Sequence, residues 1–536
     1  MLILAVAVFF RFWQLDQIPP GLYPDVAING INATDALKNH DFKIFYPDNN
    51  GREGLFINLI ALSFWLFGAS IWSIKIVAAV FGALTVWGIY LLGRQMFAFL
   101  NPKKADLIAL LAAFFLAVSF WHVNFSRIGF RAIATPFFLV WAFYFIFKAF
   151  NGRQKLSSVF YWLAGGVFFG AGFHTYISYR IAPLILVPIL IFQIIYSFPK
   201  LRQTAADAFS KIWWKWAIFL AATFIIALPI GSYFLHNPQD FMGRTGQVSV
   251  LGAAEPLKTL AKTTIQTFGA FNVHGDNNWR HNYSGQPLLF WPIGIFFLLG
   301  LIISAAQALN FKSYREEKWL ALTAAWTLLV WFAAMLLPAV LTNEGLPHAL
   351  RMIGVIPPVF LLAGFGAFWF YQLLKKLLVK NSSAKNKILV SLCVLFLIII
   401  GLAQHQKYFL DWAKRPEVKN EFTQRYVDEA NYLNSLPDSV AKYVLINEDG
   451  VRVPYPDGLP MTAQTIIFMT KDKANVNYLM PEFTGQIKAQ EITNEAVFIP
   501  LKKDGAAMEQ LRKIFPAGKI EDKGSFEIFK VNMPQI

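Results

Sequence analysis

Apolar runs of about 20 residues recur along most of the chain, and short polar segments separate them. Runs such as Ile71–Phe97 and Asn386–Leu402 are long enough to cross a hydrocarbon core as helices. The strands of a membrane barrel would instead alternate apolar and polar residues. The pattern therefore predicts an α-helical polytopic membrane protein.

We expect about eleven transmembrane helices. The first is Met1–Leu15 and the second is Ile71–Phe97, and the others lie near residues 105–123, 132–149, 157–173, 181–198, 213–235, 286–309, 319–341, 352–374 and 388–404. Lysine and arginine gather in alternate loops, as in the loop after Phe97, which carries Lys103 and Lys104. The positive-inside rule then places the N-terminus in the cytoplasm and the C-terminal region outside.

The apolar stretch 54–70 is followed at once by the span that begins at Ile71. A further crossing there would need a reversal within about two residues, and it would invert the charge parity of every later loop. We therefore expect 54–70 to form an interfacial helix on the outer surface, within a first outer loop that covers residues 16–70.

Residues 410–536 are mostly polar, unlike residues 1–409. Helical patterns cover Glu417–Leu436 and Ala506–Phe515. Patterns typical of strands cover Tyr443–Asn447, Thr465–Thr470, Ala496–Leu501 and Ser525–Val531. The sequence thus predicts a small extracytoplasmic α/β domain at 410–536, after a transmembrane domain at 1–409.

Composition supports this division and excludes some functions. The 536 residues are 56% hydrophobic and 16% aromatic, which is far more apolar than a soluble domain. The net charge of +16 follows from lysine and arginine in short loops, so it reflects topology and not nucleic acid binding. The one cysteine, Cys393, lies in an apolar run, so the chain has no internal disulfide.

The first outer loop is the polar segment most typical of a catalytic site. Between residues 19 and 56 it reads PPGLYPDVAINGINATDALKNHDFKIFYPDNNGREGLF, and it holds Asp25, Arg52 and Glu53 in a chain with 15% charged residues. Carboxylates gathered at a membrane surface are candidates for chemistry, although a solvated loop explains each of them equally well.

Further polar groups fall on the predicted outer side. They come from the phrases NFSRIGFR, HTYISYR, HGDNNWRHN and TNEGLPHALR, and the candidates among them are Arg127, Arg131, His174, Tyr176, Tyr179, Arg180, Asp276, Arg280, His281, His348 and Arg351. Arginine on the translocated face opposes the positive-inside trend, which favours an anionic ligand. Snorkelling towards lipid headgroups is the alternative for any single arginine. The histidines lack the close paired spacing of a zinc site, and interfacial hydrogen bonding is the alternative for each.

No Walker, GxGxxG or HExxH motif occurs in a usable context, so cytosolic nucleotide chemistry has no support. An anionic headgroup on a long apolar tail would suit the architecture. The transmembrane helices would receive the tail, arginines would bind phosphate, and a carboxylate would deprotonate an acceptor. A polyprenyl-phosphate sugar is such a molecule.

The order of these phrases resembles the GT-C membrane glycosyltransferases of family 39, which include protein O-mannosyltransferases and aminoarabinose transferases. In bacterial members the first outer loop reads approximately PPGLxxDEAxNGxDA and then NNGREPLF, where this chain has PPGLYPDVAINGINA and NNGREGLF. SRIGFR, HTYISYR, GDNNWRHN and LPHALR are similar to phrases of that group as well. The resemblance covers about residues 10–410 and departs from the pattern at Val26 and Gly54.

The resemblance implies transfer of a sugar from a polyprenyl-phosphate donor with inversion of the anomeric centre. It gives Asp25 the place of the catalytic aspartate and Glu53 that of a metal ligand, with His348 as a second ligand. No cofactor other than a divalent cation is expected. For the donor phosphate we expect Arg127, Arg131 or Arg351, with Arg52 and Arg180 as further candidates. Substrate contacts are expected from His174, Tyr176, Tyr179, Asp276, Arg280, His281 and His348.

The expected partners are thus the lipid-linked donor, membrane lipid, and an acceptor that is a lipid, a glycan or a protein, on the outer face of the cytoplasmic membrane. Two other functions remain open at this stage. One is a transporter of polyprenyl-linked glycolipids, which would call for broken helices or internal symmetry. The other is a non-catalytic carbohydrate-binding protein, which Val26 makes worth considering.

Overall fold

The computed structural model describes residues 1–151, 155–200, 205–241, 249–310, 319–379, 382–455, 457–480 and 495–532. Two compact units make up the chain. The helical unit consists of Met1–Leu15, Glu53–Phe56 and Lys75–Trp412, and the mixed unit consists of Asp16–Arg52, Ile57–Ile74 and Ala413–Ile536. Most of the predicted first outer loop therefore groups with the C-terminal residues.

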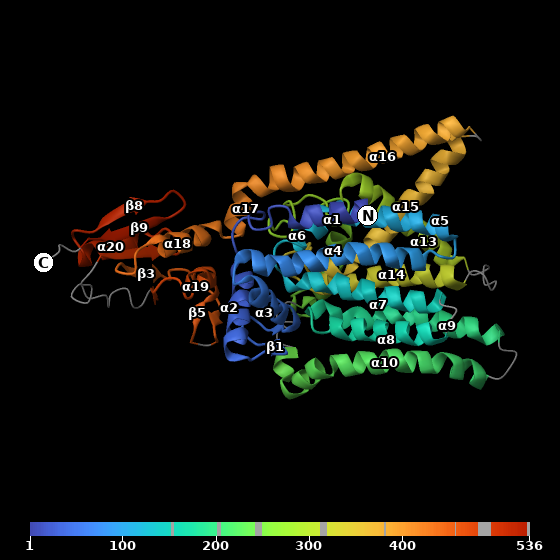
Figure 1. The fold of residues 1–536 in the computed structure, drawn as a ribbon, viewed down its shortest axis with the longest axis horizontal. Helices are drawn as coiled ribbons and strands as arrows, with labels where there is room; N and C mark the ends of the chain where they lie inside the picture. The colour runs from blue at the N-terminus through green and yellow to red at the C-terminus, as the bar shows by residue number, and fades with distance from the viewer. Residues whose placement is uncertain are drawn as a thin grey trace. The chain divides into compact units, whose positions relative to one another are not determined.

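The helical unit is built mainly from long apolar helices (Figure 1). α7 packs against α8, α8 against α10, and α15 against both α5 and α13. The helices are α1 (Leu2–Phe12), α4 (Ile71–Met96), α5 (Pro102–Val118), α6 (Phe120–Phe125), α7 (Ala134–Asn151), α8 (Lys155–Gly172), α9 (Leu186–Lys200), α10 (Ala205–His236), α12 (Pro256–Gly269), α13 (Trp291–Leu309), α14 (Trp319–Val340), α15 (Ile356–Leu374) and α16 (Ser383–His405).

Among the described residues, 8 helical segments are long and apolar enough to cross a membrane. They are Ile71–Met96, Arg131–Asn151, Ile177–Ile194, Trp213–His236, Trp291–Leu309, Trp319–Val340, Ile353–Val379 and Ser383–Lys414. Leu2–Phe12, Leu55–Phe67 and Leu156–Gly172 are apolar but shorter. The predicted fold class, a polytopic helical membrane protein, is confirmed, and the expected number of crossings stays a prediction.

The predicted span at 105–123 is broken at Ser119, between α5 and α6. The side chain of Arg11 lies at this break and is fully buried. Its guanidinium donates to the carbonyl oxygens of Ala117 (2.9 Å) and Leu116 (3.3 Å), and one of its nitrogens lies 2.6 Å from Nδ1 of His122. A buried arginine thus satisfies carbonyl groups at the end of α5, which have no intrahelical partner.

The N-terminal part of the mixed unit holds the helix that carries Asp25. This helix, α2, spans Pro24–Asn39, and the short strands β1 (Phe45–Tyr46) and β2 (Arg52–Glu53) follow it. α3 (Leu55–Phe67) has 13 residues. A helix of this length measures about 20 Å, which is less than the ~30 Å of a hydrocarbon core. The interfacial placement of 54–70 remains a prediction that this length favours.

The C-terminal part of the mixed unit contains a five-stranded sheet in the order β6-β3-β7-β9-β8 (Figure 1). β3 (Ala441–Leu445) pairs in parallel with β6 (Val476–Leu479) and β7 (Ala496–Pro500), while β9 (Glu527–Val531) runs antiparallel to β7 and to β8 (Lys519–Asp522). Residues of α18 (Gln424–Ser435) and α19 (Gln464–Thr470) share one core cluster with the sheet, and α20 (Gly505–Ile514) contributes to another. A short pair of strands, β4 (Arg452–Val453) and β5 (Leu459–Pro460), completes the fold.

Two local predictions for this region are wrong. Thr465–Thr470 belongs to the helix α19 and not to a strand. Ile466 packs in the sheet cluster, whereas Phe468 packs against α2, so a helix buries both apolar faces. The predicted helix Glu417–Leu436 is divided into α17 (Pro416–Glu421) and α18, because Thr423 adopts a left-handed conformation with φ of 52°.

Candidate active site and metal centre

Asp25 lies in the first turn of α2, directly after Pro24. An acidic residue in this position interacts favourably with the helix dipole. The side-chain amide of Asn49 donates a hydrogen bond to Oδ1 of Asp25, and the aspartate is partly exposed. Asn49, Asn50 and Gly51 all have positive φ angles, so the loop turns sharply at the point where it meets the carboxylate. Asp25 is therefore held by one amide and remains accessible.

Arg52 fixes this loop on α2. Its guanidinium donates to Oδ1 of Asn29 (2.7 Å), to Oδ1 of Asn32 (2.6 Å) and to the carbonyl oxygen of Asp48 (3.2 Å). Its exposed fraction is 2%. Since Asn29 and Asn32 are three residues apart, they lie on one face of the helix. Phosphate binding by Arg52 stays a prediction, and its contacts favour a role in positioning Asn49.

Val26, which replaces the acidic residue of the resembled pattern, has an exposed fraction of 1%. A carboxylate at this position would be buried, at a cost of several kcal/mol unless it were paired. In this chain, position 26 is part of the apolar core, and Asp25 is the carboxylate left at the start of the helix.

In the helical unit, buried Glu53 forms an ion pair with the partly exposed Arg131. Nε of Arg131 lies 3.0 Å from Oε2 of Glu53, and the two side chains are 16% and 4% exposed. The guanidinium of Arg131 also stacks over the ring of Tyr176 at 5.4 Å. Arg180 is also close enough to be attracted by the charge of Glu53 and repelled by that of Arg131. Two of the predicted cations thus gather around one carboxylate.

The other predicted arginines have different surroundings. Arg127 is fully buried, and its guanidinium donates to the carbonyl oxygens of Phe10, Trp13 and Gln14 at 3.0, 2.6 and 3.1 Å. It satisfies acceptors at the C-terminal end of α1, which favours a structural role. Arg351 contacts Thr342 and both the carbonyl oxygen and the carboxylate of Glu344.

The predicted residues His174, Tyr179 and Arg180 lie at or near the helix η2 (Ile177–Ile185). Nε2 of His174 lies 2.8 Å from the carbonyl oxygen of Ile226, so this histidine links to α10. Tyr179 is fully buried. Arg180 donates to the carbonyl oxygen of Phe241 and stacks on the rings of Phe234 and Phe241. These contacts are structural, and substrate contacts at these residues remain predictions.

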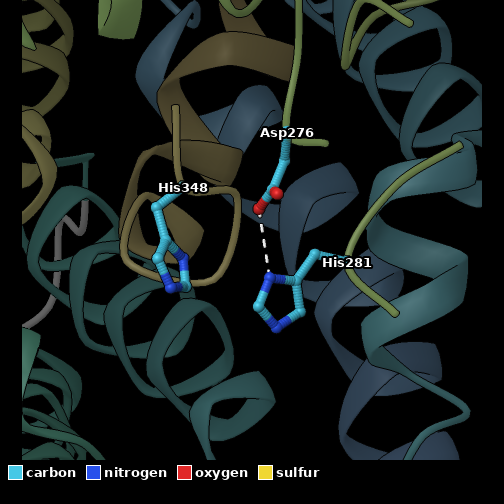
Figure 2. Close-up of side chains that lie close together, drawn as sticks. All are labelled: Asp276, His281 and His348. Atoms are coloured by element: carbon cyan, nitrogen blue, oxygen red, sulfur yellow. Dashed lines mark hydrogen bonds and ion pairs between the residues drawn. The ribbon is translucent and has the colours of Figure 1, made fainter. Parts of the chain in front are cut away.

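Asp276, His281 and His348 form the candidate metal centre (Figure 2). Their ligand atoms all lie within 4.8 Å of one another. Nδ1 of His281 lies 3.1 Å from Oδ2 of Asp276, and the rings of His281 and His348 are 4.9 Å apart. An ionised carboxylate only accepts hydrogen bonds, so Nδ1 of His281 is the donor in this contact.

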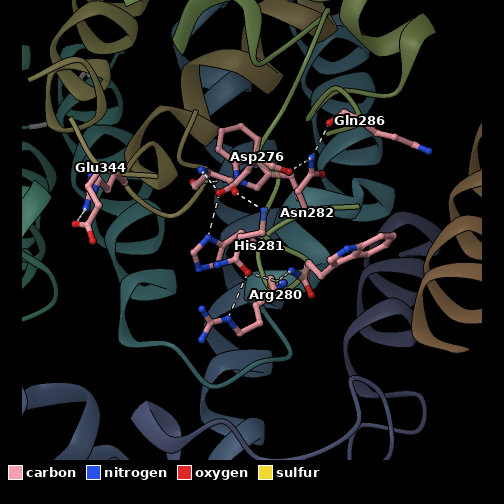
Figure 3. Close-up of polar contacts among 12 residues, drawn as sticks. Asp276, Arg280, His281, Asn282, Gln286 and Glu344 are labelled. Carbon is pink, nitrogen blue, oxygen red and sulfur yellow. Dashed lines mark hydrogen bonds and ion pairs between the residues drawn. The ribbon is translucent and has the colours of Figure 1, made fainter. Parts of the chain in front are cut away.

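The loop 275–286 holds Asp276 and His281 in this arrangement (Figure 3). Gly275 and Asp276 exchange backbone hydrogen bonds with Gly285, and the side-chain amide of Asn282 donates to the carbonyl oxygens of Gln286 and Asp276. Oδ1 of Asp276 accepts from the amide of Asn278 at 2.8 Å. Arg280, a predicted substrate contact, instead contacts Asn278 within the loop, and its carbonyl oxygen accepts from Asn124.

Asp276 also anchors the second histidine. Its Oδ2 accepts a hydrogen bond from the backbone amide of Ala349 at 2.8 Å, and Ala349 directly follows His348. One carboxylate therefore sets both His281 and the segment of His348. Ligands of a tetrahedral zinc ion lie about 3.4 Å apart, so adjustments of about 1 Å would let these side chains share a cation. One carboxylate and two imidazoles are a donor set that suits zinc.

This set differs from the predicted one. The prediction named Glu53 with His348, whereas Glu53 pairs with Arg131, and the group detected among the described residues contains His348 with Asp276 and His281. Asp276 and His281 were not predicted as candidate ligands, because their positions differ by five, which is not the spacing of a single helical face. Asn49 was missed as a partner of Asp25, although the NNG turn signal before Arg52 could have indicated it.

The chain is similar to one protein family and to several solved structures. Residues 55–232 match the family model described as dolichyl-phosphate-mannose-protein mannosyltransferase. The structure of ArnT from Cupriavidus metallidurans bound to undecaprenyl phosphate superimposes with a TM-score of 0.59 at 14% identity, covering 100% of this chain and 98% of that chain. Its apo form gives a TM-score of 0.57 at 13% identity, with the same coverage.

The apo oligosaccharyltransferase of Archaeoglobus fulgidus gives a TM-score of 0.49 at 14% identity, covering 99% of this chain and 74% of that chain. No curated protein sequence matches the chain. The predicted resemblance is confirmed by the family model and the ArnT fold: the chain is a multi-pass membrane protein with the fold of the GT-C glycosyltransferases.

Proposed function

We propose that the protein transfers a monosaccharide from a polyprenyl-phosphate-linked donor to a hydroxyl acceptor, with inversion, at the outer face of the cytoplasmic membrane. The observation that carries the proposal is Asp25, an accessible carboxylate at the start of a helix, oriented by Asn49. The structure of ArnT, which superimposes on this chain, was solved with bound undecaprenyl phosphate, and this supports a polyprenyl-phosphate donor.

The proposed chemistry is a single displacement. Asp25 accepts the proton of the acceptor hydroxyl while that oxygen forms a bond to the anomeric carbon. The bond between the anomeric carbon and the phosphate oxygen breaks, and polyprenyl phosphate leaves with one more negative charge than it had in the diester. A general base of this kind contributes about 10²–10⁴ to the rate.

Arg131 is the arginine best suited to the leaving phosphate. It is partly exposed and pairs with Glu53, whereas Arg127 and Arg52 are fully buried or nearly so and donate to protein oxygens. A charge-assisted donor in a site with little water stabilises a developing phosphate dianion strongly. Arg180, in η2, adds positive charge to the same neighbourhood.

An apolar groove supports the proposal that the donor carries a lipid tail. The groove has a volume of about 630 Å³ and is lined by residues of η2, α9 and α14, among them Leu184, Val187 and Trp326. Tyr176, under Arg131, is eight residues before Leu184, and η2 joins them. Because a 3₁₀ helix rises about 2 Å per residue, these eight residues would span about 16 Å between the phosphate near Arg131 and the groove. We assign the groove to the isoprenoid chain of the donor.

Asp276, His281 and His348 would hold a divalent cation. When bound, such a cation supplies positive charge that polarises phosphate oxygen. The test is the metal content of the purified protein: wild type and Glu53→Gln should retain bound zinc, whereas His281→Ala should lose it. Loss of zinc from Glu53→Gln but not from His281→Ala would instead support the set predicted from the sequence.

The test of function uses purified protein with a panel of hexose and pentose polyprenyl phosphates and with lipid, glycan and peptide acceptors. We expect wild type to release polyprenyl phosphate from at least one donor. Asp25→Asn should release none and should still bind undecaprenyl phosphate. If both proteins instead carried the uncleaved donor across the membrane of proteoliposomes, the result would contradict the proposal and support a transporter.

A further inference from the structure

The segment that leads into α2 is held by residues from the C-terminal part of the mixed unit. The carbonyl oxygen of Leu22 accepts hydrogen bonds from the hydroxyls of Thr465 (2.7 Å) and Thr423 (3.1 Å). The amide of Gly21 donates to Oε1 of Gln424 at 2.5 Å. These partners are about 400 residues away in sequence, and they bind the backbone three to four residues before Asp25.

Gly21 makes this contact feasible. It has a φ of +70°, and a Cβ at this position would lie 2.1 Å from the carbonyl oxygen of Phe422. Any larger residue would push the Gly21–Leu22 backbone away from the turn between α17 and α18. The turn itself is shaped by Thr423, whose left-handed φ of 52° directs the chain into α18. Both sides of the contact therefore use unusual backbone conformations.

A second contact joins α19 to the middle of α2. A Cβ on Gly30 would lie 2.7 Å from the ring of Phe468, so the helix and the ring are in close contact. Two ion pairs extend it, Lys471 with Asp35 and Lys38 with Asp472. The Lys38–Asp472 pair is 51% and 63% exposed, and exposed pairs contribute little stability.

We propose that Thr423, Gln424 and Thr465 are positioning residues that set the start of α2, and with it Asp25, for the transfer reaction. The two hydroxyls occupy both lone pairs of the Leu22 carbonyl, which fixes the direction of the peptide that enters the helix. The first turn of α2 begins at the next residue, because the amides of Val26 and Ala27 bond to the carbonyl oxygen of Tyr23. The inference rests on the proposed function of Asp25, and it gives the C-terminal region a role in positioning the catalytic base.

The experiment compares the double variant Thr423→Val/Thr465→Val with Thr465→Ser, Gly21→Ala and the control Lys38→Ala, in the full-length protein. We expect the double variant and Gly21→Ala to lower kcat about tenfold to a hundredfold, because small displacements of a reacting group are costly. Their KM for donor should stay within about twofold of wild type. Thr465→Ser and Lys38→Ala should remain close to wild type.

Hydrogen exchange at the amides of Val26 and Ala27 gives a measurement independent of turnover. Faster exchange in the double variant, together with the fall in kcat, supports the proposal. Unchanged kcat, or a fall without faster exchange, overturns it. Asp25→Asn is measured in the same series. If that variant turned over at the wild-type rate, the proposed base would be wrong, whereas the exchange data would still show whether the hydroxyls hold the helix start.

Discussion

Two aspartates show how differently this protein treats a carboxylate. Asp25 is partly exposed, begins a helix and has the amide of Asn49 as its side-chain partner in the hydrogen bonds described above. Asp276 is 3% exposed and accepts from Asn278, His281 and Ala349. The first keeps lone pairs available for a substrate proton, and the second accepts hydrogen bonds that orient the loop and the two histidines of the candidate metal centre. Partner number and exposure, rather than residue type, separate a reacting group from an orienting group.

Replacing each aspartate by alanine should affect turnover and stability in opposite ways. Asp25→Ala should lower turnover by about 10³ or more and leave thermal unfolding almost unchanged. Asp276→Ala should destabilise the protein by about 3–5 kcal/mol, because it leaves buried donors without an acceptor. Turnover and thermal unfolding of both variants check this. A large loss of stability in Asp25→Ala would remove the distinction.

Arg127 and Arg131 extend the comparison to cations that are four residues apart. Arg131→Ala should weaken donor use by about 2–4 kcal/mol in kcat/KM, with incomplete rescue by lysine, which lacks the planar fork. Arg127→Ala should chiefly lower the melting temperature, because three carbonyl oxygens lose their donor. Equal kcat/KM losses at equal stability would mean that both arginines contact the phosphate.

Glu429 provides a third carboxylate, buried in α18 and paired with Arg425 at 2.6 Å. Burial raises the pKa of Glu429 from 4.5 to about 8, against the opposing effect of Arg425. A raised folded pKa means that its stabilising contribution is complete below pH 4.5 and is lost as pH rises through 8. Hydrogen exchange of the sheet, corrected for intrinsic rates, should show on the order of 2–3 kcal/mol lost between pH 6 and 9. Glu429→Gln should remove most of this dependence.

A feature could be predicted from the sequence where the residues that form it lie close together along the chain. Apolar run length gave the helices, and the phrase around Asp25 gave the candidate base. The candidate metal centre was missed because Asp276 and His348, which are 72 positions apart in the sequence, come together only in the folded chain, and no local pattern indicates this. The same limit applies to Thr465, whose hydroxyl binds Leu22.

Local propensity also gave a wrong secondary structure for a segment that is buried on two faces. The stretch 465–470 is rich in β-branched and aromatic residues, which favours a strand, yet it forms α19 because Ile466 faces the sheet cluster and Phe468 faces α2. The arginines were predicted as one class of phosphate ligand. Only the surroundings of the side chains separate Arg127 and Arg52, which are buried and bind protein oxygens, from Arg131, which is partly exposed and pairs with Glu53.

The smallest expected effect concerns Asn49, the side-chain partner of Asp25. Asn49→Ala removes one amide donor and leaves the carboxylate in place, so kcat should fall about tenfold, equivalent to about 1.4 kcal/mol. Asn49→Asp is the matched variant, since it keeps the size of the side chain but places a second negative charge beside Asp25. That charge disfavours ionisation of the pair, so the acidic limb of the pH–rate profile should move to higher pH in Asn49→Asp and should not move in this direction in Asn49→Ala. If both variants have wild-type kcat and pH profiles, the hydrogen bond from Asn49 does not orient the base, and Asp25 depends on the start of α2 alone.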